Sequence, residues 1–186
     1  MSNSRRDFFR QLVDKTLDQA ADILEERLPV ARPELPRTRL RPPGAIPEAR
    51  LLETCYRCGN CVDVCPAQAI KHIKGESDEQ NGTPFIEARS QPCLVCDGLE
   101  CMQACPSGAL QPVARQDIRM GLAVVDLAAC RRSQGEDCRV CVDLCPYGEQ
   151  AMRIDDSGGT VQVLSACVGC GICEWKCPER AVTVRM

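Results

Sequence analysis

Four cysteine-rich motifs hold the residues of this chain that are best suited to chemistry. The first motif, C-Y-R-C-G-N-C-V-D-V-C-P at residues 55–66, has the C-x2-C-x2-C-x3-C-P spacing that binds iron–sulfur clusters in bacterial proteins. The fourth motif, which begins at Cys167, repeats this spacing, whereas the second widens one gap to four residues and the third widens another to seven. The spacing predicts four [4Fe–4S] clusters with all sixteen cysteines as iron ligands: Cys55, Cys58, Cys61, Cys65, Cys93, Cys96, Cys101, Cys105, Cys130, Cys138, Cys141, Cys145, Cys167, Cys170, Cys173 and Cys177.

The pairing of the motifs has two solutions. Thiolates are soft ligands, and four of them complete a [4Fe–4S] cubane without leaving an iron open. The first three cysteines of such a motif wrap one cluster, and the fourth normally binds the other cluster of a pair. Consecutive pairing joins the first motif with the second and the third with the fourth, whereas nested pairing joins the first with the fourth and the second with the third. The spacing between motifs allows either arrangement.

Cysteine at this density also occurs in disulfide scaffolds and zinc sites. Sixteen cysteines in 186 residues would suit a small secreted protein held by disulfides. The repeated C-x2-C spacing and the proline after each fourth cysteine count against disulfides, and no secretory apolar segment precedes the cysteines. Zinc sites usually combine separated C-x2-C pairs or cysteine with histidine. We therefore expect iron–sulfur clusters.

Other reactive residues are few. His72 is the only histidine, and we expect it to be an exposed structural residue in a strand. The sequence has no haem-attachment motif, nucleotide-binding glycine motif or acid–base pair, so we expect an electron-transfer subunit without a catalytic site. Aromatic residues are scarce, so clusters must help to fill the interior. Tyr56, Tyr147 and Trp175 lie in or beside the cysteine loops, where we expect them to cover clusters.

Residues 1–28 predict an amphipathic helix, because apolar residues recur there at steps of three and four. Such a helix would dock on a partner or a second copy of the chain; the alternatives are packing on its own body and binding at a membrane surface. Arg5 and Arg6 resemble a twin-arginine export motif, but charged residues follow instead of an apolar run. We therefore expect a cytoplasmic location and no transmembrane segment.

Residues 29–50 contain six prolines and five arginines, a composition that favours an extended strap over helix or sheet. We expect its arginines to be solvated or paired with acidic surface. Residues 51–186 contain thirteen basic and eighteen acidic residues. This acidic body argues against nucleic-acid binding and fits a protein partner with a basic patch. The chain thus divides into a docking helix (1–28), a linker (29–50) and a four-cluster body (51–186).

In the body, short alternating apolar runs separate the cysteine motifs. The fold class we expect is α+β: two pseudo-symmetric tandem modules of the bacterial 2[4Fe–4S] ferredoxin-like type, preceded by the amphipathic helix and the proline-rich extended strap. Short helices or turns should surround each fourth cysteine and end at its proline. The expected strands are 69–73 paired with 84–88, 109–113 paired with 122–126, 151–154 paired with 160–164, and a last strand at 181–185.

These motifs resemble a known family. The segments 52–61, 92–110 (with C-P-S-G-A), 119–124 (R-M-G-L-A-V) and 166–173, together with the seven-residue gap after Cys130, are similar to the NapF/NapG/MauM ferredoxin-type proteins of periplasmic nitrate reductase and methylamine-utilisation systems. The second motif also resembles that of four-cluster electron-transfer subunits of molybdenum and tungsten oxidoreductases. The resemblance covers the chain from Arg41 to its end.

The resemblance implies an electron carrier with four [4Fe–4S] clusters, which relays electrons between another carrier and a molybdenum or tungsten oxidoreductase or quinol-linked complex. The alternatives are a maturation factor for a molybdoenzyme and a self-assembling wire subunit linked through its N-terminal helix. The resemblance also favours nested pairing. That arrangement would join Cys55, Cys58 and Cys61 with Cys177; Cys167, Cys170 and Cys173 with Cys65; Cys93, Cys96 and Cys101 with Cys145; and Cys130, Cys138 and Cys141 with Cys105.

Overall fold

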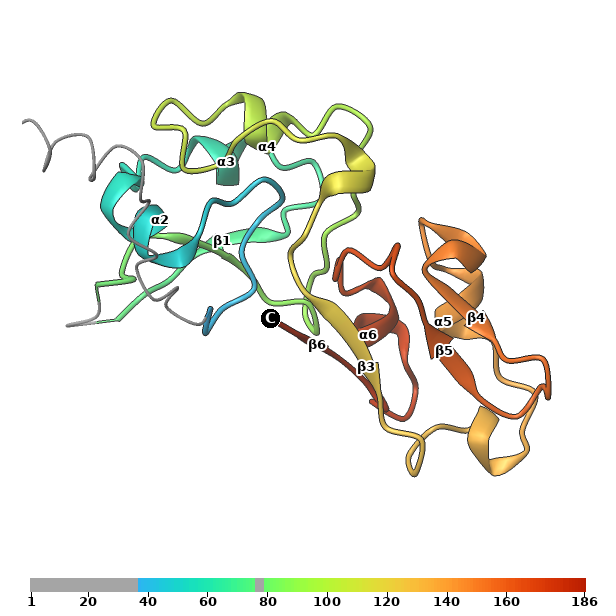
Figure 1. Ribbon diagram of the computed structural model, residues 1–186. Coiled ribbons are helices and arrows are strands. Elements are labelled where there is room, and N and C mark those ends of the chain that lie inside the picture. Colours follow the sequence, from blue (N-terminus) through green and yellow to red (C-terminus); the bar gives the residue numbers. More distant parts are fainter. Residues whose placement is uncertain (1–36, 76–78) are drawn as a thin grey trace, which may run out of the picture. The chain divides into compact units, whose positions relative to one another are not determined.

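The computed structural model describes residues 37–75 and 79–186 (Figure 1). The expected docking helix at residues 1–28 and the first part of the strap lie outside the described residues. Residues Leu35–Met186 form one compact unit, so the cysteine motifs and the second half of the strap belong to the same body. In the part of the chain that the structure describes, no helix has the length and apolar character to cross a membrane.

Two of the expected hairpins are present. Strand β1 (Ile70–His72) pairs antiparallel with β2 (Pro84–Ile86), and β4 (Met152–Ile154) pairs antiparallel with β5 (Val161–Val163). The β4–β5 turn is closed by Asp155, whose carboxylate accepts hydrogen bonds from the backbone N–H groups of Gly159 at 2.9 Å and Thr160 at 3.2 Å. Each hairpin connects two successive cysteine motifs.

The expected pairing of residues 109–113 with 122–126 is wrong. Strand β3 (Leu122–Val125) pairs instead with the last strand, β6 (Val182–Arg185), so that these two distant segments lie side by side (Figure 1). Residues 109–111 face the strap, where Ala45 and Leu110 form an isolated antiparallel bridge. The strap's prolines lack N–H donors and keep this pairing from growing into a longer ladder.

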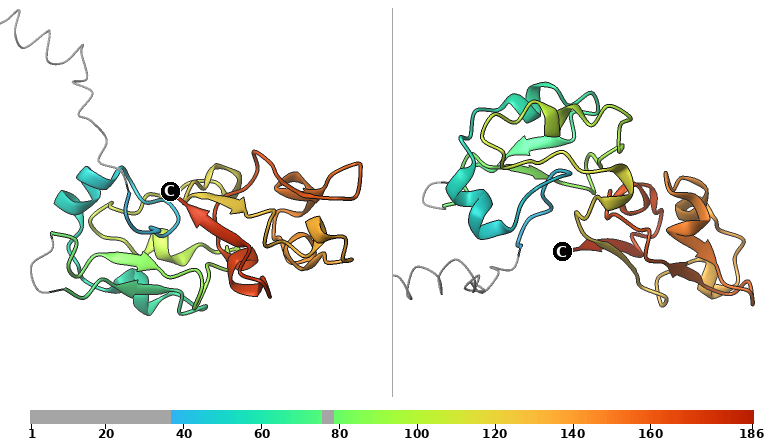
Figure 2. Two further views of the ribbon diagram at one scale, coloured as in Figure 1. Left: turned by 90° about the horizontal axis from the view of Figure 1, so that it is seen from below. Right: turned by 45° about the horizontal axis from the view of Figure 1, so that its top comes forward.

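The same plan therefore occurs twice along the chain. We call residues 37–121 the first module and residues 122–186 the second module. Each contains two cysteine motifs, an inner hairpin between them, and an outer pairing of the segment before the first motif with the segment after the second. In the first module the strap takes the place that β3 takes in the second, which the sequence did not reveal. In Figure 2 the first module runs from blue to yellow and the second from yellow to red.

As expected, a short helix lies just before the fourth cysteine of each motif, and it contains the third cysteine. These helices are α3 (Asn60–Asp63), α4 (Glu100–Gln103), α5 (Val140–Asp143) and α6 (Ile172–Lys176). The third residue after each fourth cysteine has a positive φ: 51° at Gln68, 72° at Gly108, 58° at Gly148 and 54° at Arg180. The Cys-Pro turn thus has one backbone geometry in all four motifs. The described residues also contain single turns of 3-10 helix: η1 (Arg115–Asp117), η2 (Arg132–Gln134) and η3 (Gly148–Gln150).

The strap is part of the body. Helix α2 (Glu48–Thr54) crosses the expected boundary between residues 50 and 51. Arg41 was expected to be solvated or paired with acidic surface; it is paired with an acidic residue, but it is completely buried, and so is the carboxylate of Glu48 to which its guanidinium binds. The same side chain donates hydrogen bonds to the Thr83 hydroxyl at 2.9 Å and the Pro84 carbonyl at 2.8 Å. Arg41 thereby fastens the strap to α2 and to β2.

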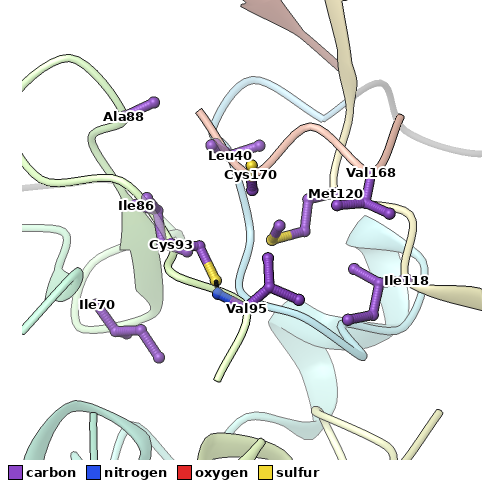
Figure 3. Packing of buried hydrophobic residues seen from close by; sticks show 10 residues of the cluster. All are labelled: Leu40, Ile70, Ile86, Ala88, Cys93, Val95, Ile118, Met120, Val168 and Cys170. Carbon is purple, nitrogen blue, oxygen red and sulfur yellow. Dashed lines mark hydrogen bonds between the residues drawn. The ribbon is translucent and has the colours of Figure 1, made fainter. Parts of the chain in front are cut away.

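Small aliphatic residues and cysteines make up the interior. One cluster joins residues of the strap, of β1 and β2 and of the second motif with Val168 and Cys170 of the second module (Figure 3). A second cluster lies within the second module, around Ala123, Met152 and Val182. A third, small cluster packs α2 through Leu51 against Ala109. Cysteines belong to all three clusters, or pack against them, so the interior is built around these side chains.

Candidate iron–sulfur sites

Three cavities are each lined by four cysteines. Site A is lined by Cys55, Cys58, Cys61 and Cys105 and has a volume of about 340 Å³. Site B is lined by Cys65, Cys93, Cys96 and Cys101, with about 350 Å³. Site C is lined by Cys145, Cys167, Cys170 and Cys173, with about 340 Å³. The identical donor sets indicate that all three cavities suit the same cofactor.

The remaining four cysteines lie close enough for their charges to interact, and we call this group site D. Burial, together with the charges of neighbouring Cys130, Cys138 and Cys177, raises the pKa of Cys141 to about 11. Three of these residues belong to the third motif, and Cys177 is the last cysteine of the fourth. Site D therefore has the composition of the other three sites: three cysteines from one loop and one from the neighbouring motif.

Nested pairing is wrong, because every site combines consecutive motifs. In the first module, Cys105 of the second motif joins the loop of the first, and Cys65 of the first motif joins the loop of the second. In the second module, Cys145 of the third motif joins the loop of the fourth, and Cys177 of the fourth motif joins the loop of the third. The hairpins explain this outcome. Each inner hairpin reverses the chain between two successive motifs and brings the second back beside the first. The loop lengths that the sequence displays do not distinguish this path from a longer return.

All sixteen cysteines are free of disulfide bonds. In residues 37–75 and 79–186, no three cysteine, histidine, aspartate or glutamate side chains converge closely enough to hold a single metal ion. The cysteines stand instead around the walls of cavities of about 340–350 Å³. This arrangement suits a polynuclear cluster that takes one thiolate from each side.

The raised pKa values of the cysteines indicate that a positively charged group must bind in these sites if the thiols are to ionise. Burial, with a smaller contribution from nearby thiols, raises the pKa of Cys61 and Cys93 to about 12. Burial likewise raises the pKa of Cys101 and Cys170 to about 11. Such thiols stay protonated at neutral pH unless positive charge compensates their ionised form. Iron ions supply that charge and are offset by the thiolates, so the donor set fits a [4Fe–4S] cluster.

Backbone N–H groups point at several of the sulfur atoms. Cys65 Sγ accepts from Ala69 N at 3.4 Å, and Cys177 Sγ accepts from Ala181 N at 3.2 Å, two equivalent positions in the repeat. For Cys105, burial raises the pKa, but hydrogen bonds from Leu110 and Ser107 outweigh this effect and lower it overall. Donors of this kind stabilise sulfur in its anionic form, as a cluster ligand requires.

Left-handed backbone shapes the loops around the sites. Arg57, Val95 and Gly169 occupy the same place between the first two cysteines of their motifs, with φ of 56°, 50° and 72°. A β-branched residue such as Val95 rarely adopts this conformation, so its loop is strained. At Gly169 a side chain would also collide with the backbone of Gly121, since an added Cβ would lie 2.5 Å from its carbonyl group.

Sites B and C meet where the two modules touch. The N–H of Cys93 donates to the carbonyl of Cys170 at 3.0 Å, which links a loop of site B directly to a loop of site C. Met120 N donates in the same way to the Val168 carbonyl at 3.1 Å. Figure 3 shows Cys93 and Val95 of the first module gathered with Met120, Val168 and Cys170 in one packed cluster.

His72 was expected to be an exposed structural residue in a strand; it does lie in β1, but its expected exposure is wrong. It is half-buried and lines site A. Its Nδ1 lies 2.7 Å from the Gly82 carbonyl, and an added Cβ at Gly59 would lie 3.2 Å from its Nε2. Tyr56 and Tyr147 line sites A and C. Trp175 is 39% exposed and stacks against Lys176.

Comparison with known proteins agrees with this geometry. Residues 54–109 match a family model described as a 4Fe-4S dicluster domain, and residues 161–183 match one described as a 4Fe-4S binding domain. The first match spans the first two motifs, which are the two that the structure pairs.

The chain is similar to three curated relatives. It is 37% identical to the methylamine utilization ferredoxin-type protein MauM of Methylobacillus flagellatus, over 98% of this chain and 82% of the relative. It is 38% identical to the ferredoxin-type protein NapG of Escherichia coli, over 94% of this chain and 81% of the relative, and 30% identical to NapF of that organism, over 77% and 83%. Ferredoxin-type iron–sulfur electron transfer and [4Fe–4S] clusters follow from these matches.

The expected cytoplasmic location is wrong. NapG and MauM are periplasmic electron-transfer proteins, which points away from the cytoplasm. The expectation relied on the charged residues after Arg5 and Arg6, which interrupt any apolar run. Since the match to MauM covers 98% of this chain, it includes nearly all of the segment that was interpreted in this way.

Proposed function

Because the chain belongs to the family of MauM and NapG ferredoxin-type proteins, we propose that sites A to D each hold one [4Fe–4S] cluster and that the protein relays electrons between a redox enzyme and another carrier. The observation that carries this proposal is the sorting of all sixteen cysteines into four sets of four, three of which line cavities of nearly equal volume. When bound, the clusters supply one-electron redox chemistry. The protein contributes the ligands, the hydrogen bonds to sulfur and the packing that limits access of water.

The sites follow one another in a single order. Two cysteines of site A, Cys55 and Cys105, pack against the small cluster around Leu51. Site B belongs to the central cluster through Cys93, and site C joins it through Cys170. The cysteines of site D belong to, or pack against, the cluster of the second module. Cysteine pairs whose charges act on each other connect neighbouring sites: Cys61 with Cys101 between A and B, Cys93 with Cys170 between B and C, and Cys173 with Cys141 between C and D. The proposed relay runs along the order A, B, C, D.

Site A is the end at which we place contact with an external partner. Cys58 is exposed, and Tyr56 beside it is 70% exposed, so the edge of the cavity reaches the surface. A redox partner that covers Tyr56 would shorten the path for an electron to site A. The net acidic charge of the body favours a partner with a basic patch, which would speed the encounter.

The remaining expectations enter the proposal as follows. The relay needs no catalytic site of its own, since its work is finished when the electron leaves. We keep the segment 1–28 as the element that docks on the partner or on a second copy of the chain. A catalytic oxidoreductase subunit, of the molybdenum or tungsten type, is the partner that the motif resemblance favours.

Metal analysis tests the cluster count. We expect about sixteen irons and a matching amount of acid-labile sulfide per chain after anaerobic purification, because each of four cubanes contributes four. A value near eight would contradict the assignment of the two irregular motifs. Paramagnetic resonance of the reduced protein should show magnetic interaction between neighbouring clusters.

A turnover experiment separates the relay from a maturation factor. The experiment uses the oxidoreductase that co-purifies with the chain. A relay must be present and intact while that enzyme turns over, and the enzyme should reoxidise the dithionite-reduced chain. A maturation factor is needed only while the enzyme is made, so its later removal would leave turnover unchanged. A self-assembling wire would show association of the isolated full-length chain with itself in a sizing measurement, whereas a strict monomer excludes it.

A further inference from the structure

One cation is held at the junction of sites B and C. Arg115 belongs to η1, in the segment that leads from the first module to the second. Its guanidinium pairs with the carboxylate of Asp97 at 2.8 Å. Asp97 directly follows Cys96 of site B and is one of the charges that act on that thiol.

The other side of the guanidinium faces site C. Arg115 lies over the ring of Tyr147, with 5.7 Å between the guanidinium carbon and the ring centroid, which is within the range of a cation–π contact. Tyr147 lines the cavity of site C and follows Cys145 by two residues. Its hydroxyl donates to the backbone carbonyl of Arg115 at 2.7 Å. Two contacts therefore bind ring and arginine into one rigid unit.

Tyr147 also reaches site B. Its side chain packs against the hydrophobic cluster that contains both Cys93 and Cys170. The Arg115 guanidinium therefore contacts the Tyr147 ring, which itself packs against the hydrophobic cluster between sites B and C.

A second arginine at this junction differs in its surroundings. Arg89 pairs with Glu174 at 3.3 Å, and the Glu174 side chain is only 12% exposed, so its negative charge stays close and little screened. Asp97 is fully exposed, and water screens its charge. Arg115 therefore keeps more of its positive field at the junction than Arg89 does.

We propose that Arg115 is a positioning residue whose positive charge, opposed by Asp97, sets the reduction potentials of the clusters in sites B and C. The inference rests on the proposed function, since it requires these two sites to be filled. Adding an electron makes a cluster more negative, so a nearby cation stabilises the reduced form and raises its potential.

Potentiometric titration followed by paramagnetic resonance tests this proposal in the full-length, cluster-loaded chain. In Arg115→Gln we expect the ratio of reduced to oxidised inner cluster, at a fixed potential, to fall at least threefold. That change corresponds to a lower potential by about 30 mV, at about 59 mV per tenfold change in a one-electron couple. Arg115→Lys keeps the charge and should retain the original potential. Asp97→Asn removes the opposing charge and should shift the potential upward, by less because Asp97 is solvated.

The signs decide the outcome. A structural role for Arg115 would lower stability without giving opposite shifts in Arg115→Gln and Asp97→Asn. The proposal would be overturned if the reduction potential shifted in the same direction in both variants. It would also be overturned if the potential of Arg115→Gln were unchanged while its iron content stayed at the wild-type value. Arg153→Gln, on the exposed face of β4, is the matched control and should leave the inner potentials unchanged. A wild-type chain that contains too little iron to fill the four sites would instead contradict the proposed function itself.

Discussion

The pairing of cysteines can be tested by counting iron in double variants. The structure places Cys65 and Cys96 in one cavity, site B, and Cys170 in another, site C. Replacing Cys65 by alanine should empty site B and remove about four of about sixteen irons. Adding Cys96→Ala should remove no more, because both residues belong to the same site. Adding Cys170→Ala instead should remove about eight irons, since a second site is lost.

Nested pairing makes the reverse prediction. It would place Cys65 with Cys170, so that the Cys65/Cys170 variant loses about four irons and the Cys65/Cys96 variant loses about eight. The assay is iron and labile sulfide per chain, measured on anaerobically purified protein, with circular dichroism to show that each variant remains folded. Equal iron loss in the two double variants would refute the structural assignment. The comparison holds even if a site keeps part of its iron, because each double variant is judged against the other and against Cys65→Ala.

Three further outcomes follow from individual contacts. Arg41→Met leaves the buried Glu48 carboxylate without its partner and should cost about 3–5 kcal/mol, seen as faster cluster loss in urea, whereas the Arg41→Met/Glu48→Met chain should recover much of it. Gly169→Ala should separate the modules, because its Cβ would lie 2.5 Å from the backbone of Gly121; faster amide exchange at Met120 would show this, and unchanged exchange would refute it. Hydrogen bonds from Thr160 lower the pKa of Asp155, so the β4–β5 turn is stabilised above the ordinary aspartate pKa and loosens as pH falls through the lowered value; protection of Gly159 and Thr160 that does not change with pH would contradict this.

The sequence predicted the chemistry better than the connections. Cysteine spacing alone indicated cluster loops, because the three ligands of one loop are local. The fourth ligand comes from another motif, and choosing that motif requires the path of the chain between them. Alternating apolar residues correctly indicated β1, β2, β4 and β5. For β4 and β5, the turn residues around Asp155 were a second signal.

The strap was misjudged for a physical reason. Its prolines disfavour regular structure, but they do not prevent α2 from beginning at Glu48, Ala45 from forming a single bridge with Leu110, or Arg41 from becoming buried. Burial of an arginine depends on a partner such as Glu48 that is already in place, and no local pattern announces that. The half-buried position of His72 is equally non-local, since it depends on how the β1–β2 hairpin lies against the loop at Gly59.

The bond from Cys93 N to the Cys170 carbonyl has a consequence for how the protein is loaded during biosynthesis. A filled site orders the loop that holds it, and here a backbone hydrogen bond joins that loop to the loop of the neighbouring site. Loading site B thus reduces the conformational entropy that loading site C must remove, and the converse holds equally. The two inner sites should fill together rather than at random, so that half-loaded chains with one inner cluster are scarce in a cell that supplies iron slowly.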